Sequence, residues 1–177
     1  MKLYVIGNPI AHSKSPEIHN FWLTSMKLKY KYEKKLIYEN EIEKFLVLLR
    51  EKKVLGINVT LPYKTVILNY VDKVEKNVKK IGAVNTIYVS NNQLIGANTD
   101  GLGFAKSVKH DANFVLKGKK IFIFGSGGAA RGIIFELINQ QVSSITIRNR
   151  NYKKAIALAQ SVYDNTKYRE LKIEKWD

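Results

Sequence analysis

The chain has 177 residues, of which 45% are hydrophobic, and its 30 Lys and Arg against 15 Asp and Glu give a formal net charge of +15. It contains no cysteine, which excludes disulfides, thiolate metal sites and a thiol nucleophile. The N-terminal apolar run is too short for a signal peptide, and no stretch approaches the roughly 18 apolar residues of a membrane span, so we expect a cytoplasmic protein without a membrane partner.

The basic charge raises nucleic acid as a partner, because clustered Lys and Arg neutralise phosphates. The lysines are instead scattered singly and in pairs, without a run of five or more like charges. We therefore expect a solvated basic surface that attracts small anions, and no nucleic-acid partner. The alternative, nucleic-acid binding, predicts affinity for duplex DNA that falls steeply with salt.

Apolar periodicity predicts alternating strands and helices in the first part of the chain. The expected strands are 3–6, 30–37, 55–59, 84–89 and 93–97, and the expected helices are 15–26, 41–53, 63–70, 72–80 and 100–110. We expect Ser15 to cap the first of these helices, Pro62 to open the 63–70 helix at its first position, and an Asn-rich turn to join the last two strands into a hairpin.

A second unit begins after a boundary near residues 105 to 118. Its expected elements are the strand 120–124, the helix 129–141, the strand 144–148, the helix 152–162 and the beginning of a third strand. Alternation of this kind indicates an α/β fold with a mainly parallel mixed sheet flanked by helices. A doubly wound nucleotide fold pairs two such halves, and only one is present here.

Polar residues follow three of the expected strands. Asn58 and Thr60 lie two apart and so share a strand face, with Lys64 just beyond them. The segment Asn98 to Gly101 ends another strand, and the glycines of 125–128 end a third. Amide, ammonium, carboxylate and glycine gathered at strand ends indicate an α/β enzyme.

The glycine turn Gly125-Ser126-Gly127-Gly128 stands between an apolar strand and a helix, where glycines let the backbone approach a pyrophosphate. An NAD enzyme would carry an acidic residue about 20 positions further on. Here the next strand ends in Arg148-Asn149-Arg150, and guanidinium suits the 2′-phosphate of NADP. The alternative is that these arginines only solvate a strand end.

Taken in order, these motifs resemble the shikimate dehydrogenase family across nearly all of the chain. The matching segments are 6–10 with 12–16 and 19–20, 56–64, 82–86, 96–101, and 125–131 with 149–150. The resemblance implies NADPH-dependent, reversible reduction of 3-dehydroshikimate to shikimate, a step of aromatic amino acid biosynthesis. It also implies a substrate-binding catalytic domain over 1–105 and, over 106–177, the first part of a Rossmann-like NADP-binding domain.

The resemblance assigns roles to individual residues. Lys64 and Asp100 form the catalytic pair and also contact the substrate. Ser13 and Ser15 are expected to bind the substrate carboxylate, and Asn58, Thr60, Asn85 and Asp100 are expected to hold its ring hydroxyls. Those expected to bind the cofactor are Gly125, Ser126, Gly127, Gly128, Ala129, Asn149 and Arg150, with Arg131 less securely placed.

The catalytic assignment agrees with the chemistry of ketone reduction. Hydride addition builds negative charge on oxygen, and a lysine ammonium can donate a proton there. A nearby aspartate favours the charged form of the amine. We therefore expect Asp100 to orient Lys64 and to keep it protonated.

Alternative interpretations remain open at this stage. The protein could accept quinate or use NAD, or it could be a non-catalytic module that binds a shikimate-like acid or a nucleotide. Thr60 could merely cap a helix and Asn85 could only fix a turn. His12 and His19 lack partners at metal-ligand spacing, so we expect structural or surface roles and no metal.

The family normally continues well past residue 177, completing the nucleotide sheet. We therefore expect a truncated enzyme with an unpaired strand edge, an uncovered apolar face and weak or absent turnover on its own. The sequence leaves monomer and homodimer equally open.

Overall fold

The computed structural model describes residues 1–176, which divide into two compact units. Unit 1 contains residues 1–78 and 83–98, and unit 2 contains residues 79–82 and the chain from residue 99 onward. Helix α4 (Asp100–His110) therefore falls wholly within unit 2, although the expected domain boundary lay after residue 105. The functional domain assignment remains a prediction.

Unit 1 is built on a six-stranded sheet in the order β2-β1-β3-β5-β6-β4. Its strands are β1 (Lys2–Gly7), β2 (Lys31–Leu36), β3 (Val54–Val59), β4 (Lys73–Val74), β5 (Thr86–Ser90) and β6 (Gln93–Ala97). The pairs β1–β2, β1–β3 and β4–β6 are parallel, while β3–β5 and β5–β6 are antiparallel. This is the mainly parallel mixed sheet that the sequence predicts.

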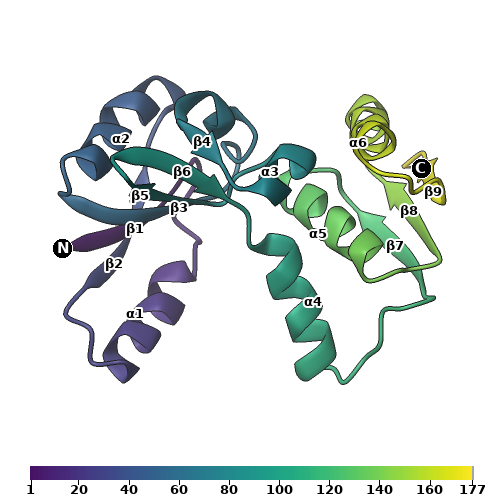
Figure 1. Ribbon diagram of the computed structural model, residues 1–177, viewed down its shortest axis with the longest axis horizontal. Coiled ribbons are helices and arrows are strands. Elements are labelled where there is room, and N and C mark those ends of the chain that lie inside the picture. The colour runs from purple at the N-terminus through teal and green to yellow at the C-terminus, as the bar shows by residue number, and fades with distance from the viewer. Residues whose placement is uncertain (177) are drawn as a thin grey trace. The chain divides into compact units, whose positions relative to one another are not determined.

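The two faces of this sheet pack differently. One face lies under α2 (Ile42–Arg50) and the 3-10 helix η2 (Val66–Tyr70), with a large core whose fully buried side chains include Ile6, Ile42 and Ile87. The opposite face carries a smaller cluster of Val5, Ile10 and Tyr32. Figure 1 shows α2 and α1 (Ser15–Ser25) on opposite sides of the strands.

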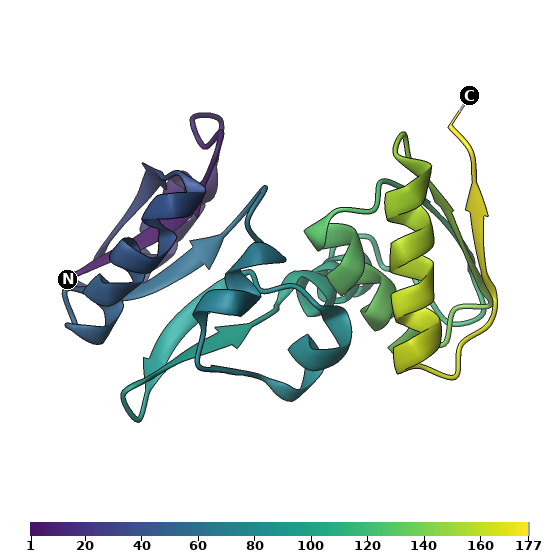
Figure 2. The same cartoon turned by 90° about the horizontal axis from the view of Figure 1, so that it is seen from above.

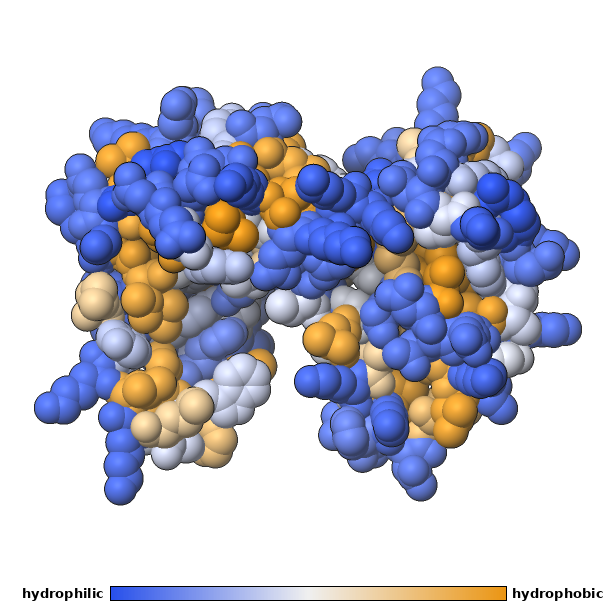
Figure 3. All heavy atoms as spheres, in the orientation of Figure 1, coloured by the Kyte–Doolittle hydropathy of each residue, from blue (hydrophilic) through white to orange (hydrophobic). Residues whose placement is uncertain are grey.

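Helix α1 lies against this face of the sheet, but none of its own residues is buried. Ile18, Phe21 and Trp22 are exposed, and Figure 3 shows apolar atoms among hydrophilic ones where α1 lies. The prediction that Ser15 caps this helix is wrong. Lys14 occupies the N-cap position without a side-chain capping bond, and Ser15 is the first helical residue.

The prediction of a helix opened by Pro62 is also wrong. Residues 61–65 form turns, and the 3-10 helix η2 follows them. The physical reason lies in tertiary contacts. The Lys64 carbonyl accepts a hydrogen bond of 2.7 Å from Val84 N, so it is committed to a neighbouring segment, and Leu68 N donates to the Thr65 carbonyl instead. The buried Tyr63 hydroxyl donates to the Ile37 carbonyl at 2.8 Å and anchors the turn.

The expected hairpin is confirmed, with β5 and β6 paired from Thr86–Ala97 to Ser90–Gln93. Asn91 and Asn92 have φ values of 48° and 59°, the left-handed backbone that a tight hairpin turn requires and that asparagine tolerates. The predicted 72–80 helix is instead β4 followed by α3 (Lys76–Ile81). A short 3-10 helix, η1 (Glu39–Glu41), precedes α2.

Unit 2 has a parallel three-stranded sheet in the order β7-β8-β9, close to the elements expected. Its elements after α4 are β7 (Lys120–Phe124), α5 (Gly128–Asn139), β8 (Ser144–Arg148), α6 (Tyr152–Asn165) and β9 (Leu171–Glu174). Figure 2 shows α6 running beside these strands. Among the described residues, Phe122 of β7 is 45% exposed, Phe124 is 67% exposed and Trp176 is 48% exposed, which agrees with the expected uncovered apolar face.

Helices α4 and α5 pack closely because glycine stands at their contact. A Cβ added at Gly101 would lie 2.3 Å from the Gly132 carbonyl oxygen and 2.7 Å from Glu136 Cβ. Backbone therefore approaches backbone at this point, and the first turn of α4 is fixed against α5. Asp100, the candidate catalytic carboxylate, is the neighbour of Gly101 in that turn.

No helix within residues 1–176 combines the length and the apolar character that crossing a membrane requires. Over the same residues, no group of three or more His, Asp or Glu side chains is arranged to hold a metal ion.

Candidate functional site

A row of polar side chains crosses unit 1 on the face of the sheet that α1 packs against. Because side chains alternate along a strand, the register of β1 with β2 and β3 places Tyr32 and Asn58 on one face, and Asn58 pairs directly with Thr86 across β3 and β5. Asn85 precedes Thr86 and is 9% exposed. The non-sequential strand order therefore joins side chains that are up to 54 residues apart, from Tyr32 to Thr86.

These side chains form one hydrogen-bonded network. The Tyr32 hydroxyl donates to Asn58 Oδ1 at 2.7 Å. Asn58 Nδ2 donates to the Asn85 carbonyl at 3.3 Å and to Thr86 Oγ1 at 3.0 Å. The Thr86 hydroxyl lies 2.9 Å from Asn85 Oδ1 and donates to it. Two of the predicted substrate residues, Asn58 and Asn85, are thus brought together and held by partners from other strands.

Tyr32 is a member of this network that sequence reasoning did not single out. It is 2% exposed, and the His19 ring stacks on its ring with centroids 4.1 Å apart and planes 4° apart. The Asn20 side chain accepts from Tyr32 N and donates to the Tyr32 carbonyl. The one available signal was the His19-Asn20 pair, which sequence analysis noted as part of a family motif without linking it to the strand of Tyr32.

Burial sets the protonation of both rings. It raises the pKa of Tyr32 far above its ordinary value, and a hydrogen bond with Ser15 opposes that shift only in part. The Tyr32 phenol therefore stays protonated and remains a donor over the neutral and moderately alkaline range. Burial lowers the pKa of His19, which favours the neutral ring in its stack on Tyr32.

The two serines stand at the start of α1. Ser13 Oγ accepts a hydrogen bond of 3.3 Å from Ser15 N, so the segment curls around the Ser13 hydroxyl. Both serines are partly exposed. Ser15 partly opposes the rise of the Tyr32 pKa, so its side chain lies near the phenol that donates to Asn58.

Thr60 lies where β3 ends beside the end of β1. Its N–H donates to the Ile6 carbonyl at 2.9 Å, and a Cβ added at Gly7 would lie 2.6 Å from Thr60 Cγ2 and 2.8 Å from the Leu61 carbonyl oxygen. Glycine at position 7 therefore permits the two strand ends to approach, and this contact sets the position of the Thr60 side chain.

Lys64 and Asp100 belong to different units. Lys64 is partly buried in the turn after β3, where its carbonyl is bonded to Val84 N. Asp100 is partly buried and is the first residue of α4. Their pairing remains a prediction.

The glycine turn of unit 2 has the local geometry that a phosphate-binding turn needs. Gly125 follows β7 with a φ of 114°, a conformation that favours glycine, and its N–H donates to the Arg148 carbonyl at 2.8 Å. A Cβ added at Gly125 or Gly127 would meet no heavy atom within 4 Å. Gly127 is the N-cap of the 12-residue helix α5 and supplies no side-chain cap. The turn thus presents backbone and a helix N-terminus over open space, which fits a dinucleotide pyrophosphate.

The basic residues after β8 differ in their contacts. Arg148 is held by an ion pair of 2.9 Å with Glu174 and lies over the Phe122 ring. Asn149 Nδ2 donates to the Asn151 carbonyl at 2.7 Å, whereas the side chain of Arg150 is exposed. Because Phe124 pairs with Arg148, Arg150 follows the strand that neighbours the glycine turn.

Arg131 has a different environment from Arg150. It lies in α5, and a Cβ added at Gly82 would be 3.4 Å from its Nη1. Burial lowers the pKa of Arg131 from its ordinary value. Arg131 therefore packs against the segment 79–82 of its own unit, which weakens the expectation that it reads a cofactor phosphate.

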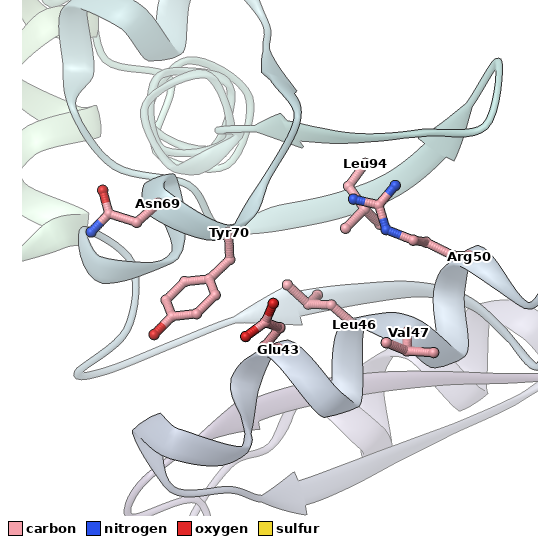
Figure 4. Close-up of a pocket in the computed structure, with 7 residues that line it drawn as sticks. All are labelled: Glu43, Leu46, Val47, Arg50, Asn69, Tyr70 and Leu94. Atoms are coloured by element: carbon pink, nitrogen blue, oxygen red, sulfur yellow. The ribbon is translucent and has the colours of Figure 1, made fainter.

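A separate hollow of about 310 Å³ opens in unit 1 between α2, η2 and β6 (Figure 4). Figure 4 shows the Glu43 carboxylate and the Arg50 guanidinium lying well apart along it. Arg50 is engaged by Asp72 at 2.8 Å. The residues that line the hollow are Glu43, Leu46, Val47, Arg50, Asn69, Tyr70 and Leu94. None of them was predicted to bind substrate or cofactor.

Comparison with known families matches both units. Residues 5–87 match the model described as the shikimate dehydrogenase substrate binding domain, and residues 106–176 match the model described as shikimate / quinate 5-dehydrogenase. Among curated proteins, the NADP(+) shikimate dehydrogenase of Pelagibacter ubique is 39% identical over 172 residues, covering 97% of this chain and 62% of that protein. The chain thus spans less than two thirds of the length of this relative.

Solved structures agree. The shikimate 5-dehydrogenase of Thermus thermophilus, in complex with NADP(H) and shikimate, superposes with a TM-score of 0.84 at 33% identity, over 98% of this chain and 62% of that chain. The Listeria monocytogenes shikimate 5-dehydrogenase, in complex with shikimate and NAD, gives a TM-score of 0.85 at 32% identity, over 99% and 61%. By sequence and by fold, this chain belongs to the shikimate dehydrogenase family.

Proposed function

We propose that this chain carries the substrate-binding and catalytic residues of an NADP-dependent shikimate dehydrogenase, which reversibly reduces 3-dehydroshikimate to shikimate. The observation that carries this proposal is the network of unit 1, in which Asn58 and Asn85 are positioned together beside the serines of α1. Hydroxyl and amide groups of this kind suit a small acid with several ring hydroxyls. The match to the substrate binding domain of the family supports shikimate as this ligand.

In the proposed reaction Lys64 is the proton donor. NADPH supplies the hydride to the substrate carbonyl carbon when it is bound. The Lys64 ammonium donates a proton to the oxygen on which negative charge develops, and in the oxidation direction the Lys64 amine accepts the proton of the substrate hydroxyl. Asp100 is the proposed carboxylate partner of Lys64 in this reaction.

The proposed cofactor site lies at the carboxyl ends of β7 and β8. Gly125, Ser126, Gly127, Gly128 and Ala129 would hold the pyrophosphate through backbone N–H groups. The exposed Arg150, with Asn149, would bind the 2′-phosphate, because guanidinium forms bidentate, charge-assisted bonds with phosphate. Arg131 has a smaller part in this proposal because it is packed beside Gly82.

Oxidation of shikimate by the whole protein, followed with NADP and with NAD, tests this function. Wild-type protein is expected to prefer NADP, and Arg150→Ala is expected to weaken NADP binding by about 10- to 100-fold, the effect of losing hydrogen bonds to a charged group. The rate of shikimate oxidation with NAD should be the same in Arg150→Ala as in the wild-type protein. Arg169→Ala, which removes an exposed arginine after α6, is the control and should leave both rates unchanged. Equal losses with both cofactors would remove Arg150 from the 2′-phosphate site.

The same assay separates the alternatives. The model that matches residues 106–176 names quinate as well as shikimate, and the Listeria structure contains NAD, so quinate and NAD are included as substrates. A non-catalytic module would bind shikimate without forming NADPH. Action in the cytoplasm, as a monomer or homodimer on a small-molecule substrate, remains part of the proposal.

The carboxylate assignment predicts a local loss of affinity. Ser15→Ala is expected to weaken shikimate binding by about 1.5 to 3 kcal/mol, the range for a hydrogen bond to a charged group, as measured by calorimetric titration. Ser25→Ala is the matched control, because this serine ends the same helix and its hydroxyl bonds only the Phe21 carbonyl. Unchanged affinity in Ser15→Ala and in Ser13→Ala would place the carboxylate elsewhere.

A further inference from the structure

In the polar network of unit 1, the donor and the acceptor of each hydrogen bond can be assigned, starting from a backbone carbonyl that can only accept. The Asn85 carbonyl can only accept, so the Asn58 atom 3.3 Å from it must be the amide nitrogen. Asn58 Oδ1 therefore faces Tyr32 and accepts the phenol proton at 2.7 Å. The amide orientation of Asn58 follows from its neighbours on both sides.

Thr86 links the amide of Asn58 to the amide of Asn85. Its Oγ1 accepts from Asn58 Nδ2 at 3.0 Å, which leaves its single proton to be donated to Asn85 Oδ1 at 2.9 Å. The side-chain oxygen of Asn85 is thus turned toward Thr86, and Asn85 Nδ2 is turned to the other side. A valine at position 86 would keep the shape of the side chain but would lose the hydroxyl that donates to Asn85 Oδ1.

Tyr32 is the first donor in this series of hydrogen bonds, and its own position is fixed by neighbouring residues. The Asn20 side chain donates to the Tyr32 carbonyl at 2.8 Å and accepts from Tyr32 N at 2.9 Å, and the His19 ring stacks on the Tyr32 ring. The hydroxyl therefore has little freedom to leave Asn58. Without it, the amide oxygen of Asn58 would lose its donor in a largely buried place, which is a costly state for a polar atom.

We propose that Tyr32 and Thr86 are positioning residues of the substrate site, which fix the Asn85 amide so that its Nδ2 donates to a ligand oxygen. Asn85 then recognises a hydroxyl or carbonyl oxygen as an acceptor, while Asn58 supports the site from behind and is not itself a main substrate ligand. The ligand identity rests on the proposed function. The orientation of the amide is inferred from its contact with Thr86.

The decisive comparison is Thr86→Val with Thr86→Ser. The valine variant is expected to weaken shikimate binding by about tenfold, and the serine variant, which retains the hydroxyl, should stay within about twofold of wild type. Tyr32→Phe is expected to weaken binding by about three- to tenfold for the same reason. Tyr88→Phe is the control, because the exposed Tyr88 lies on β5 with Thr86 and its hydroxyl bonds only Glu75.

A measurement without ligand separates this inference from the proposed function. Side-chain amide signals of Asn85, observed by NMR in the unliganded chain, are expected to shift in Thr86→Val and in Tyr32→Phe but not in Thr86→Ser or Tyr88→Phe. If wild-type protein fails to bind shikimate while these shifts occur, the proposed function falls and the positioning chain stands. Unchanged Asn85 signals in Thr86→Val, or failure of serine to restore them, would overturn the inference.

Discussion

Replacing Lys64 with alanine is expected to lower the rate of shikimate oxidation by the whole protein by about 10²- to 10⁴-fold, the usual contribution of a general acid or base. Binding of shikimate should be largely retained, because in the proposed site Ser13, Ser15 and Asn85 hold most of the ligand. The rate falls because no positioned group then exchanges a proton with the substrate oxygen on which charge develops. Steady-state rates and calorimetric affinities of the same preparations separate the two effects.

The control for this variant is Lys73→Ala, which removes an exposed lysine from β4 of the same unit. It should leave both rate and affinity unchanged. A Lys64→Ala protein that turns over as fast as wild type would reject the catalytic assignment, and one that loses rate and affinity in the same proportion would make Lys64 a binding residue only.

Gly101→Ala is expected to have the largest effect on folding, destabilising unit 2 by about 1 to 3 kcal/mol. The added Cβ would lie 2.3 Å from the Gly132 carbonyl oxygen and 2.9 Å from Gly132 C, which are backbone atoms that cannot move without shifting α5. The variant should also impair catalysis, since Asp100 precedes Gly101 in the same turn of α4. Urea unfolding followed by circular dichroism measures the stability term.

Gly103→Ala is the matched control in the same helix, because a Cβ there meets nothing within 4 Å. Alanine is a better helix former than glycine, so this variant should be more stable than wild type by about 0.5 to 1 kcal/mol. If Gly101→Ala were stabilising to the same extent, the close packing of α4 on α5 would be contradicted.

Much of the secondary structure could be predicted because it depends on local pattern. The strands Lys120–Phe124 and Ser144–Arg148 were predicted with their observed bounds, since runs of β-branched and aromatic residues are bounded there by glycine and by polar residues. The hairpin of β5 and β6 was predicted from asparagines that tolerate the left-handed backbone.

The errors arose where contacts distant in sequence override local preference. Pro62 suggested a helix start, but the Lys64 carbonyl is taken by Val84, and Tyr63 is buried with its hydroxyl on Ile37. Strand β4 has two residues and exists through its pairing with β6. No local pattern carries either piece of information.

Candidate site residues could be proposed from the sequence, but the way the fold arranges them could not be predicted. Motifs identified Asn58 and Asn85 as site residues, whereas the sequence does not show that β5 pairs with β3 and places Thr86 between their amides. Tyr32 belongs to an edge strand whose place in the sheet follows from the β2-β1-β3-β5 order. The residues that orient the site are for this reason the ones that sequence reasoning missed.

The most direct test of the account is a shikimate titration of this chain followed by NMR. The account predicts that signals of Ser15, Lys64 and the side-chain amide of Asn85 shift together and saturate at one affinity. Saturating shifts confined to the separate hollow around Glu43 and Arg50, or no shift at any shikimate concentration, would contradict the assignment of the substrate site to the polar network of unit 1.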